Sequence, residues 1–112
     1  FEALHELFGK QYDELSKQAD DIAERIRALG GFANATLSAH LRATRLKEAA
    51  EDSPEAEAMI GELSADREAL ARYVRGDLKE VQAAGDEGTA DLLVECLKTH
   101  EKAAWLLRSH LE

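Results

Sequence analysis

Proline, glycine, cysteine and long apolar runs are all scarce in this sequence. Its 112 residues include one proline and seven glycines, which leaves few positions suited to tight turns. The single cysteine, Cys96, excludes a disulfide within the chain and suits a reducing compartment, so we predict a cytoplasmic protein. No apolar run approaches the length that crosses a bilayer, and no secretory signal is visible, so we expect no membrane partner.

Basic residues are also in deficit. The chain has 14 lysines and arginines against 23 aspartates and glutamates, which gives a net charge of −9. An acidic surface repels the phosphates of nucleic acids and attracts cations. We therefore predict that this chain does not bind DNA. The charge suits a cation-binding protein, although plain solubility is the commoner reason for an acidic helical domain.

The abundant residues favour helices. Alanine, leucine, glutamate, lysine and arginine dominate, and all are strong helix formers, so we predict an all-α fold in one domain spanning residues 1–112. Gly30 and Gly31 are predicted to end a first helix near Leu29. Its apolar residues recur at steps of three and four, as on one helix face: Phe1, Leu4, Phe8, Tyr12, Leu15, Ala19, Ile22, Ile26 and Leu29.

A short second helix is predicted after the two glycines. Thr36 is a suitable N-cap, and the helix is expected to continue to about Leu46 with Leu37 and Leu41 facing inward. The following residues, 48–52, have the composition of a linker. The chain therefore contains a short connecting helix between long ones.

Two further long helices complete the predicted fold. Ser53-Pro54-Glu55 indicates a helix start, with serine as the cap and proline in the first helical position, and this helix should end at Gly85. Asp86 or Thr89 caps the last helix, whose apolar stripe is Leu93, Leu97, His100, Ala104, Leu107 and Leu111. Four long helices form the commoner closed bundle, and the pattern is already under way at Phe1, so we expect a further helix upstream.

A pair of acidic residues on the first helix is the candidate metal site. Asp20 and Glu24 are four residues apart, which places their side chains on one helix face about 6 Å apart. Two like charges at this spacing repel each other, and a shared cation would remove that cost. The alternative is that both carboxylates are solvated and paired with Lys17 and Arg27, which lie three residues away.

A histidine on the same helix extends this candidate site to a second chain. His5 lies fifteen residues before Asp20, which corresponds to roughly 22 Å along a helix. One metal ion cannot bind both residues of one chain. Two antiparallel copies, related by a twofold axis near Asp13, would bring His5 of one copy to Asp20 and Glu24 of the other, in two equivalent sites.

These three residues belong to a wider pattern. The first helix contains FEALHELF (residues 1–8), QY (11–12), DDIAERI (20–26) and LGG (29–31), with a histidine, an aspartate fifteen later and a glutamate four after that within D-x-x-A-E-R. The last helix contains DEGTADLL (86–93), HEK (100–102) and WLLR (105–108). Together these runs, which cover essentially the whole chain, resemble the Dps family, the mini-ferritins of starved bacteria.

The resemblance implies a ferritin-like helical bundle, of which the usual first helix is not seen here, assembled as a hollow dodecamer. It implies iron as the cofactor and substrate, bound between subunits by His5 of one chain and Asp20 and Glu24 of the other. The implied activity is a ferroxidase: Fe(II) is oxidised, preferably by hydrogen peroxide, ferric mineral is stored, and the cell is protected from oxidative stress. Carboxylates and imidazole are suitable ligands for iron.

Two features depart from the family pattern. The family often has an aspartate or glutamate four residues after the histidine matched by His5, and this position is Gly9. A second family histidine, about twelve residues before His5, falls upstream of the sequence. These departures support an alternative hypothesis, a structural or interaction bundle that has lost ferroxidase activity.

Other candidate residues receive structural interpretations. His100 lies on an apolar face and is predicted to be a core or interface histidine, whereas His40 and His110 are predicted at the surface. Cys96 is expected to be a buried small side chain, and Trp105 is expected to have a packing role.

Acidic residues also gather where the last helix begins. Asp86, Glu87 and Asp91 complement the positive end of the helix dipole, which is the interpretation we favour. In the resembled family, acids in this region line a threefold pore that draws cations inward, and Asp91 matches such a position.

Overall fold

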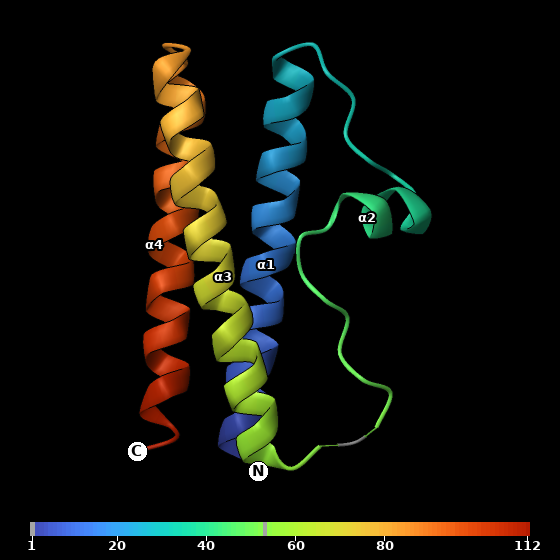
Figure 1. Cartoon of the computed structure of the whole chain (residues 1–112), viewed down its shortest axis with the longest axis vertical. Helices are drawn as coiled ribbons and strands as arrows, with labels where there is room; N and C mark the ends of the chain where they lie inside the picture. The colour runs from blue at the N-terminus through green and yellow to red at the C-terminus, as the bar shows by residue number, and fades with distance from the viewer. Residues whose placement is uncertain (1, 53) are drawn as a thin grey trace. The chain divides into compact units, whose positions relative to one another are not determined.

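The computed structural model describes residues 2–52 and 54–112, and within them it contains four α-helices and no strand. They are α1 (Glu2–Ala28), α2 (Leu37–Ala43), α3 (Ala56–Ala83) and α4 (Glu87–Ser109) (Figure 1). The predicted all-α fold with three long helices and one short helix is confirmed. None of the described helices is long and apolar enough to span a membrane. The chain divides into two compact units, Phe1–Ala43 and Thr44–Glu112, which are described in turn.

In the first unit, α1 runs without interruption for 27 residues and ends at the predicted glycines. Gly30 has a φ of +92°, a left-handed conformation that glycine adopts without strain. The N–H of Gly31 then donates to the carbonyl of Ile26 at 2.9 Å, and the N–H of Gly30 donates to Arg27 at 3.0 Å. This is the Schellman arrangement, which satisfies the last carbonyls of a helix.

The short helix α2 begins as predicted and ends earlier. The Thr36 hydroxyl accepts a hydrogen bond from the N–H of Ala39 at 3.1 Å, which confirms Thr36 as the cap. The helix stops at Ala43 and does not reach Leu46, because the Thr44 hydroxyl accepts from the N–H of Leu46 at 3.1 Å and turns the backbone.

The predicted inward face of α2 is wrong for this chain. Leu37 is 89% exposed and Leu41 is 61% exposed. A helix of seven residues makes only two turns, so it presents a small apolar surface. The alternation of apolar residues correctly indicated a helix with an apolar face, but it could not indicate what that face contacts.

In the second unit, an arginine attaches the connecting segment to α3. The two guanidinium nitrogens of Arg45 donate to the Asp77 carboxylate at 2.7 and 3.3 Å, and its Cζ lies 4.6 Å from the centroid of the Tyr73 ring. Such a two-pronged pair fixes the orientation of the arginine more firmly than one hydrogen bond does. The segment after α2 is therefore held against α3.

The start of α3 corrects one sequence prediction. Pro54 was expected in the first helical position, but α3 begins at Ala56 with Glu55 as its N-cap. Glu55 has an extended backbone (φ −62°, ψ 156°), which places Pro54 outside the helix. Ser53, the predicted cap, lies outside the described residues.

A tight turn joins α3 to α4. Gly85 has a φ of +75°, and the N–H of Asp86 donates to the carbonyl of Val81 at 3.2 Å. Asp86 then caps α4, since its carboxylate accepts from the Thr89 N–H at 3.1 Å and from the Thr89 hydroxyl at 2.6 Å. Of the two predicted caps, the structure selects Asp86.

The helices α3 and α4 pack against each other as an antiparallel pair (Figure 1). Glu68 contacts Arg108 and Arg75 contacts Glu101, so residue numbers fall on α4 as they rise on α3. Leu107 is completely buried, and Cys96 is buried as predicted. Trp105, which was predicted to have a packing role, is 55% exposed, since it lies two residues before Leu107 and so points to nearly the opposite side of the helix.

A polar pair lies within this apolar packing. Arg67 is 0% exposed and His100 is 3% exposed, and Nη1 of Arg67 lies 2.9 Å from Nδ1 of His100. An arginine can only donate, so Nδ1 is the acceptor and the imidazole carries its proton on Nε2. Burial, and then the charge of Arg67, lowers the pKa of His100 to about 4. The prediction that His100 is a core histidine is confirmed.

Candidate metal site on the first helix

The three predicted ligands, His5, Asp20 and Glu24, all lie on α1 with exposed side chains. The helix between them is unbroken, so about 22 Å separates His5 from Asp20 along its axis. No three histidine, cysteine, aspartate or glutamate side chains are grouped to hold a metal anywhere in residues 2–52 and 54–112. One chain thus supplies the carboxylate pair and the histidine at separate places.

The cations beside the carboxylate pair are engaged by other groups. Nζ of Lys17 forms an ion pair with Asp21 at 2.9 Å, and this hydrogen bond raises the pKa of Lys17, to which Glu24 adds the smallest contribution. Nη1 of Arg27 donates to the carbonyl of Gly31 at 2.9 Å. Within the described part of the chain, neither Lys17 nor Arg27 forms an ion pair with Asp20 or Glu24, although the charge of Glu24 still acts on Lys17.

This arrangement suits a divalent metal ion. Two exposed carboxylates four residues apart can approach one cation from the same helix face. Carboxylate oxygens and an imidazole nitrogen are ligands that iron accepts. The carboxylates and the histidine on α1 are therefore of a chemical kind that fits iron.

Gly9 lies one helical turn after His5, on the same face. A Cβ atom built at Gly9 would meet nothing within 4 Å. A larger side chain therefore has room at this position in the chain. The family's carboxylate is absent at this position, although there is room for its side chain.

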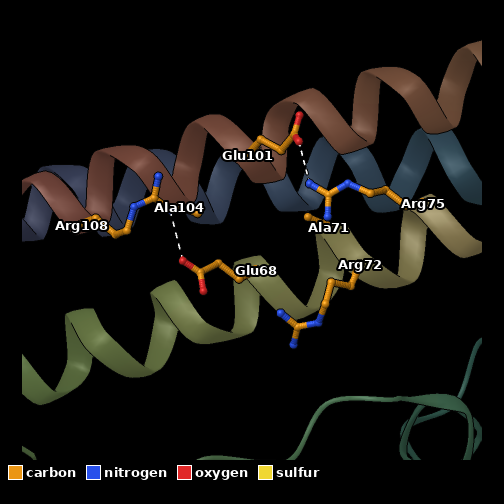
Figure 2. A pocket seen from close by; sticks show the side chains of 7 residues that line it. All are labelled: Glu68, Ala71, Arg72, Arg75, Glu101, Ala104 and Arg108. Atoms are coloured by element: carbon orange, nitrogen blue, oxygen red, sulfur yellow. Dashed lines mark hydrogen bonds and ion pairs between the residues drawn. The ribbon is translucent and has the colours of Figure 1, made fainter.

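A groove lies between α3 and α4. Its volume is about 410 Å³, and it is lined by Glu68, Ala71, Arg72, Arg75, Glu101, Ala104 and Arg108 (Figure 2). Glutamates pair with Arg75 at 2.7 Å and with Arg108 at 3.1 Å, and these are the two ion pairs drawn in Figure 2. Two of the three arginines in the groove are paired with glutamates of the facing helix, so these ion pairs connect α3 and α4.

Of the acidic residues at the start of α4, Asp86 has a role that its hydrogen bonds show. The Asp86 carboxylate accepts two hydrogen bonds from Thr89, which supports the favoured interpretation of a helix cap. Asp91 is exposed on the first turns of α4. Its role in a pore remains a prediction.

Sequence reasoning missed two groups that the structure brings together. Arg67 follows the buried Ser64 by three residues and precedes the buried Ala71 by four, so its helical position was a signal that it faces inward. The contact of Arg27 with Phe32, 4.3 Å from Cζ to the ring centroid, depends on a turn whose path the sequence did not specify.

Comparison with known proteins places these features in a family. A family model for the ferritin-like domain matches residues 1–112. A low temperature-induced protein of uncharacterised function from Nostoc sp. is 40% identical over 116 residues, which cover 100% of this chain and 63% of that protein. DNA protection during starvation protein 2 of Bacillus anthracis is 37% identical over 111 residues, which cover 99% of this chain and 75% of that protein.

A solved structure agrees in the arrangement of the backbone. The Dps protein from Vibrio cholerae, described as a member of a broad superfamily of ferritin-like diiron-carboxylate proteins, is 30% identical with a TM-score of 0.93. The match covers 100% of this chain and 70% of the Vibrio chain. The predicted ferritin-like helical bundle is thereby confirmed, and the chain belongs to the Dps family of ferritin-like proteins.

Proposed function

We propose that this chain binds and oxidises Fe(II) at a site shared by two copies, stores the ferric product and so protects against oxidative stress. The observation that carries this proposal is the exposed carboxylate pair Asp20 and Glu24, with which neither Lys17 nor Arg27 forms an ion pair. Their spacing from His5 on one continuous helix requires a second copy. The names of the relatives, which mention starvation and diiron-carboxylate proteins, support the same role.

The proposed assembly is a homo-oligomer built from twofold dimers, with a dodecamer as the complete shell and residues 1–112 as part of one ferritin-like domain. In each dimer, α1 packs antiparallel to α1 of the other copy, with the axis near Asp13. Such an isologous contact creates two equivalent sites at once. His5 of one copy then lies beside Asp20 and Glu24 of the other.

The proposed chemistry transfers electrons from iron to peroxide. Two Fe(II) ions each lose one electron, and one hydrogen peroxide takes up both electrons and two protons, so that its O–O bond breaks and two water molecules form. Because both electrons pass to one peroxide, hydroxyl radical is not released. The role of the protein residues is to bind the iron substrate and to leave positions open for the oxidant.

The test is Fe(II) oxidation in the absence of oxygen, with and without added peroxide. We expect the parent chain to form ferric product faster than buffer does when peroxide is present. A Glu24→Gln variant keeps the size of the side chain and removes its charge, and it should lose at least about tenfold in rate. Equal rates in both proteins would instead support the second candidate, a structural bundle without ferroxidase activity, which Gly9 favours.

The missing carboxylate at Gly9 gives a prediction of gained function. Gly9→Asp should tighten Fe(II) binding by roughly tenfold, because a further charged ligand raises the affinity of an oxygen-ligand site. The measurement is anaerobic titration calorimetry with Fe(II). Gly9→Asn is the matched control, since it makes the same change in helix propensity and size without the charge. Equal affinities of the two variants would show that position 9 does not face the metal.

A further inference from the structure

We infer that Phe32 and the carbonyl of Gly31 act together as a positioning device that holds the Arg27 guanidinium away from Glu24 and so keeps the metal-binding carboxylate available. This inference rests on the proposed function, and it assigns a role to three residues that lie just beyond the predicted ligands. All of them belong to the first unit of the chain.

The spacing of Arg27 makes its orientation informative. It follows Glu24 by three residues, a spacing at which glutamate and arginine commonly form an ion pair on a helix. In the structure, Nη1 of Arg27 instead donates to the Gly31 carbonyl at 2.9 Å, and its Cζ lies 4.3 Å from the centroid of the Phe32 ring. The guanidinium is thus occupied on two sides by groups outside the metal site.

The turn after α1 produces these contacts. Gly30, with its φ of +92°, reverses the chain, and the Gly31 N–H closes back onto Ile26 at 2.9 Å. The reversal places the Gly31 carbonyl and the Phe32 ring beside the last turn of the helix. Phe32 is 84% exposed, so core packing does not explain an aromatic residue here, whereas contact with a cation does.

On the N-terminal side of the carboxylate pair, Lys17 is also paired with a group other than Asp20 or Glu24. Lys17 precedes Asp20 by three residues and Asp21 by four, and it pairs with Asp21 at 2.9 Å. Exposed ion pairs at these spacings are weak, so a single competing contact redirects a flexible cation. Lys17 and Arg27 are thus each held by a group other than Asp20 or Glu24.

The effect of releasing Arg27 follows from charge. Without the ring, the guanidinium can move to Glu24, where it competes with a divalent cation for the carboxylate and repels that cation. We expect Phe32→Ala to weaken anaerobic Fe(II) binding roughly threefold at low salt, measured by titration calorimetry on the assembled protein. Phe32→Tyr keeps an aromatic face and should bind as the parent does.

A double variant separates this role from a structural one. Phe32→Ala combined with Arg27→Gln removes the cation that would be released, so Fe(II) affinity should return to that of the parent. Weaker binding that Arg27→Gln does not restore would overturn the inference, because it would mean that the ring acts through packing between chains. Unchanged binding in Phe32→Ala would also overturn it.

A Glu24→Gln variant in the same titration tests the metal site separately from the role of Phe32. If Glu24→Gln binds Fe(II) as tightly as the parent, the proposed metal site itself fails. If Glu24→Gln loses binding while Phe32→Ala does not, the site stands and only the role of Phe32 fails.

Discussion

Mixing a His5→Ala chain with a Glu24→Gln chain is expected to restore about one quarter of the parent's Fe(II) oxidation, although each variant alone is nearly inactive. The reason is the geometry of α1, on which one chain cannot bring its own His5 to its own carboxylates. Every site in a dimer of identical variants lacks one ligand. Unfolding and refolding the two variants together should produce mixed dimers.

In a mixed dimer the two substitutions fall in the same site. One site receives the altered His5 from one chain and the altered Glu24 from the other, while the second site receives only unaltered residues. Random pairing makes half of the dimers mixed, and each has one intact site of two, which gives about one quarter of the parent's sites.

A matched mixture serves as the control. Asp20→Asn and Glu24→Gln both alter the carboxylate half, so their mixed dimers have one damaged ligand in each site. This mixture should show no recovery. Recovery in both mixtures, or in neither, would contradict a site made from His5 of one chain and the carboxylates of the other.

Lowering the pH is expected to reduce the free energy of unfolding of this protein, because His100 is buried in its neutral form. Its pKa is about 4 in the folded chain and 6.5 in a model compound, so the unfolded chain binds the proton first as the pH falls. The stabilisation is complete above pH 6.5 and is lost as the pH falls through about 4. The shift corresponds to roughly 3 kcal/mol at 1.36 kcal/mol per pH unit.

The measurement is the free energy of unfolding in urea at several pH values between 7 and 4, for the parent and for His100→Gln. Glutamine can accept the hydrogen bond from Arg67 but does not titrate, so the variant should lose less stability over this range. His110→Gln, at an exposed histidine, should behave as the parent does. Equal pH dependence in the parent and His100→Gln would show that His100 does not control acid stability.

Much of the helical structure could be predicted from local patterns. The recurrence of apolar residues and the glycines at 30, 31 and 85 indicated α1, α3 and α4, since helix periodicity and C-terminal glycines are local signals. The predicted end of α2 was wrong because the Thr44 hydroxyl accepts a hydrogen bond that turns the backbone after Ala43.

The placement of the three candidate ligands along one helix could be predicted from the sequence, whereas the contacts of their neighbours could not. The spacing of His5, Asp20 and Glu24 required only an intact helix, which α1 provides. Which neighbours neutralise the carboxylates depends on competition between weak contacts, and Arg27 is decided by the path of a turn. The buried pair of Arg67 and His100 arises from packing between α3 and α4, which brings together two residues that are 33 apart in sequence.

The most direct test of the metal site is to follow ferric absorbance and hydroxyl radical together while peroxide is added to Fe(II) and protein without oxygen. For the parent, we expect rapid ferric formation with about two Fe(II) consumed per peroxide and little radical, and for Glu24→Gln slow oxidation with radical release as in buffer. Oxidation by the parent no faster than in buffer, or equal behaviour of the two proteins, would contradict an iron-oxidising site at Asp20 and Glu24.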